Sequence, residues 1–383
     1  MTPAVVGVDA LQEWTLELYT RMLATFYVEE RMKSFVRQGK CSFHASSRGH
    51  EALQVGMALL LKPRHDWFFT YYRSKALTLG LGMPLKDIFL AMLSRDGDPN
   101  SNGRNMPEQF SSRDLRLVSQ TACTGTQYLP AVGMARAIKM EASDQIVYVS
   151  SGEGATSEGE FFEALNWAAR EKLPMLFVIQ NNGYAISVPQ ATQTASEIHR
   201  IAYGFNMPSF KLDGTLFQSL YHILPPVISR IRQGGGPALV EAHVVRLDPH
   251  SSSDDQKKYR QPEELAAIFV EDPIRRAEDY LLEEGLLDAA RVEEMRARIK
   301  AEVDEAAAEA DAQPAPGGSN LLAHIFAQVG VSVASPTPPN YFSDQEITMI
   351  DAINHGLREE MELNPKILMW GEDIADPKGG SSG

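Results

Sequence analysis

Cysteine is scarce in this chain of 383 residues, and long hydrophobic runs are missing from it. The two cysteines, Cys41 and Cys123, are too few for the disulfide framework of a small secreted protein. The longest clean apolar stretches, such as Met57 to Leu61 and Met175 to Ile179, fall far short of the roughly 18 residues that a membrane helix needs. The first 20 residues lack Lys and Arg, unlike a secretory signal or a transit peptide. We therefore expect a cytoplasmic protein with reduced thiols.

Basic residues are outnumbered by acidic ones. The chain has 36 Lys and Arg against 50 Asp and Glu, a formal net charge of -14 at pH 7. A nucleic acid or an anionic membrane as main partner would need a basic face, so we expect neither. With 44% apolar and 22% charged residues the chain is typical of a soluble globular protein. Its length favours one large α/β domain plus a smaller piece, with two full domains as the alternative.

The middle of the chain alternates short apolar runs with helical patterns. Two β-branched runs have the composition of strands that are buried on both faces of a parallel sheet, and the helical pattern between them makes a right-handed crossover unit. We thus predict an α/β fold with a mostly parallel sheet and helices on both faces. The predicted helices are 11–26, 160–170 and 216–233, and the predicted strands are 145–150, 174–180 and 238–245.

The last hundred residues contain two linkers. Residues Glu283 to Ala312, rich in Ala and Glu, read as a solvated helix that ends at a Pro/Gly-rich linker. A second linker precedes a helical pattern, Ile347 to Met361, and a short strand, Ile367 to Trp370. We place a domain boundary near residues 335 to 345, with one domain over 1–334 and the beginning of another over 335–383.

Polar residues follow two neighbouring strands of the predicted sheet. Gly152-Glu153-Gly154 ends one strand, and Asn181-Asn182-Gly183-Tyr184 ends the next. Parallel strands present these ends side by side, in the crevice where ligands bind. A carboxylate, an amide oxygen and a backbone carbonyl are ligands that Mg²⁺ prefers, and glycine lets the backbone approach a phosphate closely. The pattern therefore predicts a site for a cation and a diphosphate.

Two other interpretations of this pattern were weighed against a cation and diphosphate site. Glycine-rich turns follow buried strands in many proteins without binding a ligand. A dinucleotide site would need a third glycine at position 157 and an acidic residue after the next strand, but Ser157 and Gln180 stand there. A nicotinamide-dependent oxidoreductase is therefore disfavoured.

The two turns together resemble the thiamine diphosphate signature, with Glu153 in place of the usual Asp. Around them, Gly103-Arg104-Asn105-Met106-Pro107, Thr126-Gln127 and His250-Ser251-Ser252-Ser253-Asp254-Asp255 occur in a matching order. Residues 10 to 330 resemble the α subunit of the decarboxylating component of a 2-oxo acid dehydrogenase, closer to the branched-chain (2-oxoisovalerate) type than to pyruvate dehydrogenase. Residues 346 to 383 resemble the start of its β subunit, as in a fused chain.

This resemblance assigns roles to individual residues. It implies Mg²⁺ ligands at Glu153, at the Asn182 side chain and at the Tyr184 carbonyl. His250 would also assist acyl transfer to lipoamide, as the catalytic residue of this chain. The thiamine diphosphate contacts that it implies are Tyr72, Arg73, Thr124, Gly152, Gly154, Ala155, Arg246 and His250.

Several of these positions have other interpretations. The Tyr72-Arg73 pair could form a surface salt bridge, and His250 could be a plain turn histidine. His44 and His50 occupy a segment that is substrate-facing in the family, so either is a candidate for substrate contact. Two departures from the family pattern weaken the match: Gln180 stands where an Arg often helps to hold the diphosphate, and Pro249 replaces a second histidine.

The resemblance also implies partners. The family's activating glutamate comes from the β half, so a β subunit or fused β half would complete the site, in an α2β2-like assembly or another homo-oligomer. A lipoyl-bearing acyltransferase would receive the acyl group from a small 2-oxo acid. Pyruvate and acetoin dehydrogenases are alternatives within the family. A non-catalytic cofactor-binding or assembly subunit is the alternative from another class.

Overall fold

The structure is a computed structural model that describes residues 8–320, 322–323, 325 and 346–371. Contacts divide the chain into two units, Met1–Leu321 and Leu322–Gly383. The domain boundary expected near residues 335 to 345 falls outside the described residues.

A five-stranded parallel sheet forms the centre of the first unit. Its strand order is β1-β2-β3-β7-β6. A two-stranded antiparallel hairpin, β4 and β5, follows β3. The strands are β1 (Trp67–Phe69), β2 (Val147–Gly152), β3 (Met175–Asn181), β4 (Tyr184–Ala185), β5 (Val188–Pro189), β6 (Ser209–Asp213) and β7 (Ala238–His243).

Helices surround this sheet and connect its strands. The α-helices of the first unit are α1 (Val8–Arg37), α2 (Glu51–Leu60), α3 (Lys75–Gly80), α4 (Leu85–Met92), α5 (Tyr128–Met140), α6 (Gly159–Glu171), α7 (Gln190–Gln193), α8 (Phe217–Arg232), α9 (Pro262–Ile268), α10 (Pro273–Glu283) and α11 (Ala289–Asp311). Short 3₁₀ helices are η1 (Glu153–Ser157), η2 (Ile198–Phe205), η3 (Gln256–Lys258), η4 (Phe269–Glu271) and η5 (Gly318–Asn320).

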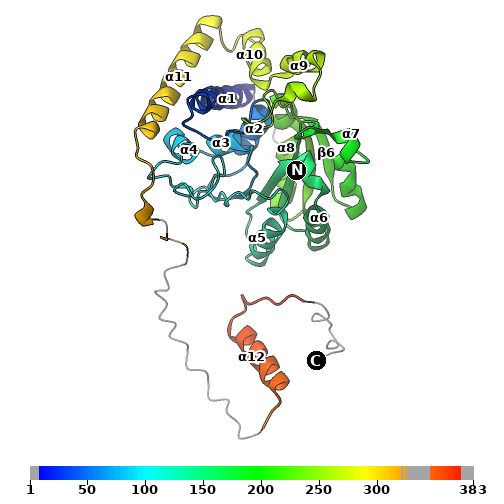
Figure 1. Ribbon diagram of the computed structural model, residues 1–383. Helices are drawn as coiled ribbons and strands as arrows, with labels where there is room; N and C mark the ends of the chain where they lie inside the picture. Colours follow the sequence, from blue (N-terminus) through cyan, green and yellow to red (C-terminus); the bar gives the residue numbers. More distant parts are fainter. Residues whose placement is uncertain (1–7, 321, 324, 326–345, 372–383) are drawn as a thin grey trace. The chain divides into compact units, whose positions relative to one another are not determined.

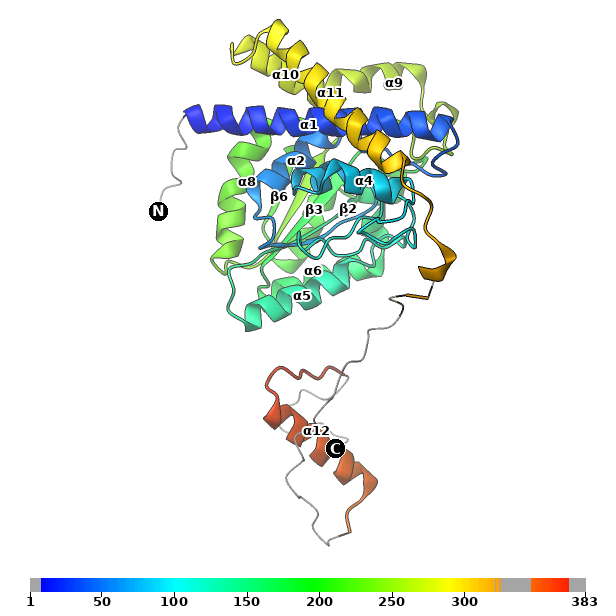
Figure 2. The same ribbon diagram turned by 90° about the vertical axis from the view of Figure 1, so that its left-hand side faces the viewer.

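The two faces of the sheet carry different cores. One core lies between the sheet and α5, α6 and η2. A larger core lies on the opposite face, where α2, α3 and α8 pack on the sheet, and α1, α4, α10 and α11 cover them. Figures 1 and 2 show α5 and α6 on one side of the strands and α1, α2 and α11 on the other. Alternate residues of the strands point into opposite cores, which explains their nearly continuous apolar character.

The fold class and the main elements are confirmed. The predicted strands correspond to β2, β3 and β7, and the predicted helices to α1, α6 and α8. The sequence reasoning missed β1 and β6. Strand β1 has three residues, and β6 reads Ser-Phe-Lys-Leu-Asp at an edge of the sheet, so neither displays a long β-branched run.

The prediction of a solvated helix over Glu283 to Ala312 is wrong in two respects. Helix α10 ends at Glu283, and α11 begins only at Ala289. One face of α11 is buried against α1 and α4. Its buried residues recur at steps of three and four along the helix: Val292, Met295, Ile299, Val303, Ala307 and Ala310. The abundance of Ala and Glu concealed this apolar stripe, which is the usual sign of a packed helix.

The second unit contains the helix predicted after the second linker, as α12 (Met349–Leu363). The strand predicted over Ile367 to Trp370 is not formed; these residues are irregular. A strand needs a neighbour to satisfy its backbone groups, and no described residue pairs with this segment. No helix in the described ranges is long and apolar enough to span a membrane.

Two glycines with positive φ provide a test of backbone packing. A Cβ on Gly49 (φ +94°) would overlap the Val245 carbonyl oxygen, whereas a Cβ on Gly82 (φ +100°) would meet no atom within 4 Å. We expect Gly82→Ala to lower the free energy of unfolding by on the order of 1–2 kcal/mol, the backbone cost alone. Gly49→Ala should cost at least about 2 kcal/mol more because it adds overpacking. Equal losses of stability in urea unfolding would contradict this close approach.

Candidate functional site

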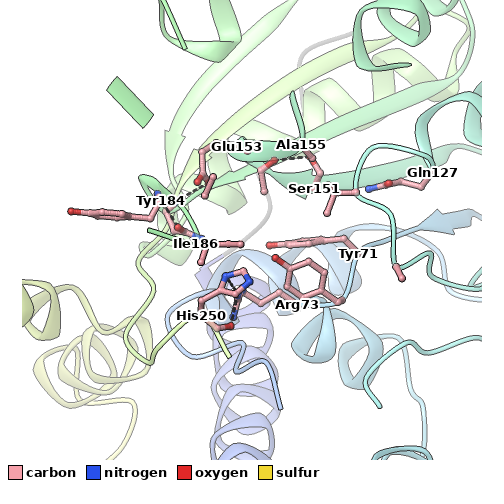
Figure 3. A pocket seen from close by; sticks show the side chains of 16 residues that line it. Tyr71, Arg73, Gln127, Ser151, Glu153, Ala155, Tyr184, Ile186 and His250 are labelled. Carbon is pink, nitrogen blue, oxygen red and sulfur yellow. Dashed lines mark hydrogen bonds between the residues drawn. The ribbon is translucent and has the colours of Figure 1, made fainter. Parts of the chain in front are cut away.

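A cavity of about 390 Å³ lies at the carboxyl ends of the parallel strands. Segments that follow β1, β2, β3 and β7 line it, together with the segment before α5. Figure 3 shows Glu153 and Ala155 on one side, Arg73 and His250 on the opposite side, and Ile186 and Tyr71 between them. The lining residues are Tyr71, Tyr72, Arg73, Ala122, Thr124, Gln127, Ser151, Gly152, Glu153, Gly154, Ala155, Asn182, Tyr184, Ala185, Ile186 and His250. Every residue predicted to bind cofactor or metal is among them except Arg246.

The two strand-end turns meet as the sequence predicted. Glu153 is 1% exposed, and its Oε2 accepts a hydrogen bond from the Asn182 backbone N–H at 3.2 Å. Asn182 Oδ1 accepts from the Tyr184 N–H at 3.2 Å. Burial raises the pKa of Glu153. The carboxylate of one turn is thus fixed beside the amide oxygen of the other.

Arg73 and His250 form the opposite wall. Arg73 is 2% exposed; it donates from Nη1 to the Ser46 carbonyl at 2.6 Å and from Nη2 to the His250 carbonyl at 3.0 Å. The surface salt bridge is therefore the wrong interpretation of Tyr72-Arg73. The His250 ring lies edge-on to Tyr72. Burial, together with the charges of Arg73 and Arg246, lowers the pKa of His250 to about 4, so its imidazole is neutral at pH 7.

Arg246 lies behind the lining residues. Its side chain is fully buried, its Cζ lies 5.8 Å from the ring centroids of both Tyr184 and Tyr259, and Nη2 donates to the Tyr259 hydroxyl at 2.8 Å. Its Nε and Nη1 have no hydrogen-bond partner among the described residues. A buried guanidinium with two unused donors is costly unless an acceptor reaches it.

Gly154 has a packing reason that the sequence did not suggest. A Cβ on Gly154 would lie 2.8 Å from the Ala185 Cβ, so the glycine lets the hairpin after β3 pack on the turn after β2. Ile186, in the same hairpin, has φ +57° and is 55% exposed. A left-handed conformation is strained for a β-branched residue. Such strain persists where the surrounding structure holds the residue in place.

The two histidines proposed for substrate contact do not line this cavity. His50 is fully buried, and its Nε2 lies 3.4 Å from Asn182 Nδ2. His44 lines a separate cavity of about 240 Å³ and belongs to a buried charge cluster, which consists of Glu29, His44, Lys75 and Glu108.

The buried charge cluster joins α1, α3 and two loops. Lys75 Nζ donates to both Glu29 carboxylate oxygens at 3.1 Å and to Glu108 Oε1 at 2.9 Å. His44 Nδ1 bonds to Glu108, and its Nε2 lies 3.1 Å from Glu29 Oε2. Burial opposes the charged form of His44, but the carboxylates outweigh it and raise its pKa to about 9. Two carboxylates thus face two cations at pH 7.

This cluster also fixes the loop that carries His44. Ala45 N–H donates to Glu108 at 2.6 Å, and Ser47 N–H donates to Glu29 at 2.8 Å. The same loop accepts the Arg73 hydrogen bond at Ser46 and receives the Ser252 N–H at the His44 carbonyl, at 2.7 Å. The cluster thereby supports both Arg73 and the His250 loop from behind.

Several lining residues were missed by sequence reasoning. Gln127 Nε2 donates to the Ser150 carbonyl at 2.9 Å, and the Tyr71 hydroxyl donates to Gln180 at 3.3 Å. Gln127 belongs to the Thr126-Gln127 motif, which was quoted without a role for this residue, and Tyr71 directly precedes Tyr72-Arg73; these motifs were the available signal. Ile186 carried no such signal, since nothing in its residue type predicts a positive φ.

A mostly parallel sheet with helices on both faces is consistent with the thiamine diphosphate-binding fold. The comparisons agree: the family model "Dehydrogenase E1 component" matches residues 19–318. The chain therefore belongs to the dehydrogenase E1 component family. This family depends on thiamine diphosphate, and its α subunits work with a β subunit.

Three relatives are α subunits. The 2-oxoisovalerate dehydrogenase subunit alpha of Bacillus subtilis is 38% identical over 314 residues, 82% of this chain and 95% of the relative. The 3-methyl-2-oxobutanoate dehydrogenase subunit alpha of Mycobacterium tuberculosis is 36% identical over 292 residues, 76% and 77% of the two chains. The pyruvate dehydrogenase E1 component subunit alpha of Staphylococcus aureus is 33% identical over 305 residues, 79% and 80% of the two chains.

The buried charge cluster predicts a loss of stability at alkaline pH. The pKa of His44 is about 9 in the folded chain, against an ordinary value of 6.5. The stability that protonated His44 gives to the folded chain is therefore fully present below about pH 6.5 and is lost as the pH rises through about 9. We expect this loss to be on the order of 3 kcal/mol, measured by urea unfolding between pH 6.5 and 10.

His44→Gln is the control, because it removes the titrating group. The variant should be less stable than the original chain at pH 7 and should lose less stability between pH 7 and 10. Identical pH profiles for the two proteins would show that His44 is not protonated in the folded state.

Proposed function

We propose that this chain is the α part of a branched-chain 2-oxo acid dehydrogenase decarboxylating component. It would take part in thiamine diphosphate-dependent oxidative decarboxylation of a branched 2-oxo acid and in reductive acylation of a lipoyl group. The proposal rests on one observation: the four family segments that follow β1, β2, β3 and β7 meet at one cavity. Family membership supplies the cofactor and the reaction type.

The substrate assignment rests on similarity. Two relatives with printed branched-chain names are 38% and 36% identical to this chain. Pyruvate is the second candidate, because a pyruvate dehydrogenase α subunit is 33% identical over a similar span. The Gly103-Arg104-Asn105-Met106-Pro107 and His250-Ser251-Ser252-Ser253-Asp254-Asp255 segments favour the branched-chain type.

Glu153, the Asn182 side chain and the Tyr184 carbonyl would hold Mg²⁺. All three are oxygen donors on adjacent turns, which is the ligand chemistry that Mg²⁺ prefers, and phosphate and water would complete the shell. Within the described ranges no group of three His, Cys, Asp or Glu is placed to hold a metal. The proposed site therefore depends on an amide and a main-chain oxygen as well as one carboxylate.

Arg73 and Arg246 would hold the diphosphate. The unused Nε and Nη1 donors of Arg246 fit an anionic acceptor that the chain does not itself provide. Guanidinium groups bind phosphate oxygens strongly because the hydrogen bonds are charge-assisted. Tyr72 and Thr124 would contact the cofactor along the same cavity.

When it is bound, thiamine diphosphate supplies the nucleophilic carbon and the electron sink for loss of CO₂. The contribution of this chain is to bind, orient and shield. His250 is neutral at pH 7, because its pKa is near 4. Its Nδ1 accepts a hydrogen bond from Arg73 Nη2 at 3.3 Å, so the ring proton lies on Nε2, which would act as the donor during acyl transfer. Ile186 and Tyr71 would exclude water from the middle of the cavity.

The partners follow from the family. E1 α subunits work with a β subunit; we propose that residues 346–383 begin a fused β half, that the assembly is α2β2-like, and that a lipoyl-bearing acyltransferase accepts the acyl group. A cytoplasmic location belongs to the same proposal. A non-catalytic binding or assembly subunit is the alternative.

The function is tested by assaying decarboxylation with an artificial electron acceptor. The chain with its β polypeptide, thiamine diphosphate and Mg²⁺ should turn over 3-methyl-2-oxobutanoate with a higher kcat/KM than pyruvate. The chain without β polypeptide should be inactive. A preference for pyruvate would move the protein to the second candidate function, and absence of turnover with every 2-oxo acid would favour the binding subunit.

The metal site is tested by Glu153→Ala and Asn182→Ala. Each variant removes one oxygen ligand from the site, so cofactor binding that depends on Mg²⁺ should fall by at least about tenfold. Titration calorimetry of the α–β assembly with thiamine diphosphate, with and without Mg²⁺, measures the effect. Glu158→Ala removes an exposed carboxylate from the same turn and should change nothing. If both variants bind thiamine diphosphate and Mg²⁺ as tightly as the original chain, Glu153 and Asn182 are not metal ligands.

A further inference from the structure

Glu241 on β7 is a buried carboxylate that hydrogen-bonds to Asn181, the residue before the proposed metal ligand Asn182. Glu241 is 2% exposed, although the four other buried residues of its strand are apolar and the strand lies inside the sheet, between β3 and β6. Its side chain shares the face of Leu239, in the core with α5, α6 and η2. An isolated charge there is unfavourable unless hydrogen bonds satisfy it, so its partners explain why it can be there.

Three donors surround this carboxylate. Oε1 accepts from Asn181 Nδ2 at 2.7 Å. Oε2 accepts from the His199 backbone N–H at 2.8 Å and from His199 Nδ1 at 2.9 Å. Glu241 thus ties the end of β3 to the start of η2.

Asn181 passes this restraint to the metal-site turn. Its second Nδ2 hydrogen bonds to Gln190 Oε1 at 2.9 Å, and its Oδ1 accepts from the Gly183 N–H at 3.0 Å. The Gly183 carbonyl accepts from the Gln190 N–H at 2.9 Å. Each polar atom of the Asn181 side chain is therefore used, and the turn that carries Asn182 and Tyr184 is held from both sides.

We infer that Glu241 is a positioning residue for the cation site: through Asn181 it sets the placement of the Asn182 amide oxygen and the Tyr184 carbonyl. The inference rests on the proposed function, which makes these two oxygens metal ligands. Groups that orient ligands in this way commonly change metal affinity 10- to 100-fold when they are altered.

An amide cannot replace the carboxylate. In Glu241→Gln the new NH₂ group must face either Asn181 Nδ2 or the two His199 donors, so a donor faces a donor. Asn181 cannot turn its amide to relieve this without losing its bonds to Gln190 and Gly183. The turn should therefore loosen while the strand stays in place.

The experiment measures metal affinity rather than turnover. In the α–β assembly saturated with thiamine diphosphate, Mn²⁺ is titrated and free Mn²⁺ is followed by electron paramagnetic resonance; Mg²⁺ competition gives its affinity. We expect Glu241→Gln to weaken both metals about 10- to 100-fold. Asn181→Asp combined with Glu241→Gln should recover much of the loss, because the new carboxylate at position 181 still accepts from Gly183 and now accepts from position 241, and Gln190 can turn its side-chain amide so that Nε2 donates to the carboxylate in place of the lost bond at Oε1.

The controls separate this inference from the metal site itself. Glu197→Gln removes a negative charge beside the same histidine, where Glu197 pairs with Lys211, and should leave metal affinity within about twofold, since it does not touch Asn181. A purely structural role would lower the melting temperature of Glu241→Gln without changing its metal affinity, and that result overturns the inference. Unchanged affinity in Glu153→Ala overturns the proposed site, whereas loss in Glu153→Ala with wild-type affinity in Glu241→Gln overturns the inference alone.

Discussion

The common direction of the five strands is the constraint on which the rest of the structure depends. Because β1, β2, β3 and β7 run parallel, the segments that leave them emerge at one edge, although the end of β1 at Phe69 and the end of β7 at His243 are 174 residues apart in the sequence. Arg73, Glu153, Asn182 and His250 become neighbours for this reason alone. An antiparallel partner between any two of these strands would send one segment to the opposite edge.

The edge of the sheet that binds a ligand must leave a cavity, so apolar side chains cannot fill it as they fill the core. In this protein, buried polar groups next to the cavity hold its walls in place. The buried charge cluster holds the loop under Arg73 and His250, and Glu241 holds the turn of Asn182. Both are fully desolvated, so each is stable only while every donor and acceptor has its partner. Removing a single member therefore leaves an unpaired charge in the interior, and the effect extends to the cavity.

The sequence predicted the parts of the fold that repeat a strong local pattern. Strand β3 is a nearly continuous apolar run and β2 begins as one, and the turns after them have a distinctive residue order, so Glu153 and Asn182 could be placed together. Strand β1 has three residues, and its pairing with β2 depends on contacts distant in sequence. The packed face of α11 was overlooked although its stripe is regular, because overall composition was given more weight than periodicity.

The supporting residues were harder to foresee than the cavity itself. The local sequence around Lys75 or Glu108 does not indicate that these charges meet in the interior, since neither segment differs from one that carries an exposed charge. Likewise the carboxylate of Glu241 could have been read as a strand-edge charge. Such pairs are defined only by the tertiary structure.

The packing of α11 on α1 has a consequence for biosynthesis. The two helices are joined by Arg31 to Asp304, and Lys40 in the loop after α1 pairs with Asp311, 271 residues further along the chain. During translation the side of α1 that packs on α11 stays uncovered while all the strands of the sheet emerge, although α2, α3 and α10 are already available to cover the rest of the helix. A chain released before Ala289, where α11 begins, would therefore have a complete sheet but would expose the side of α1 that α11 covers, a form suited to capture by chaperones and proteases.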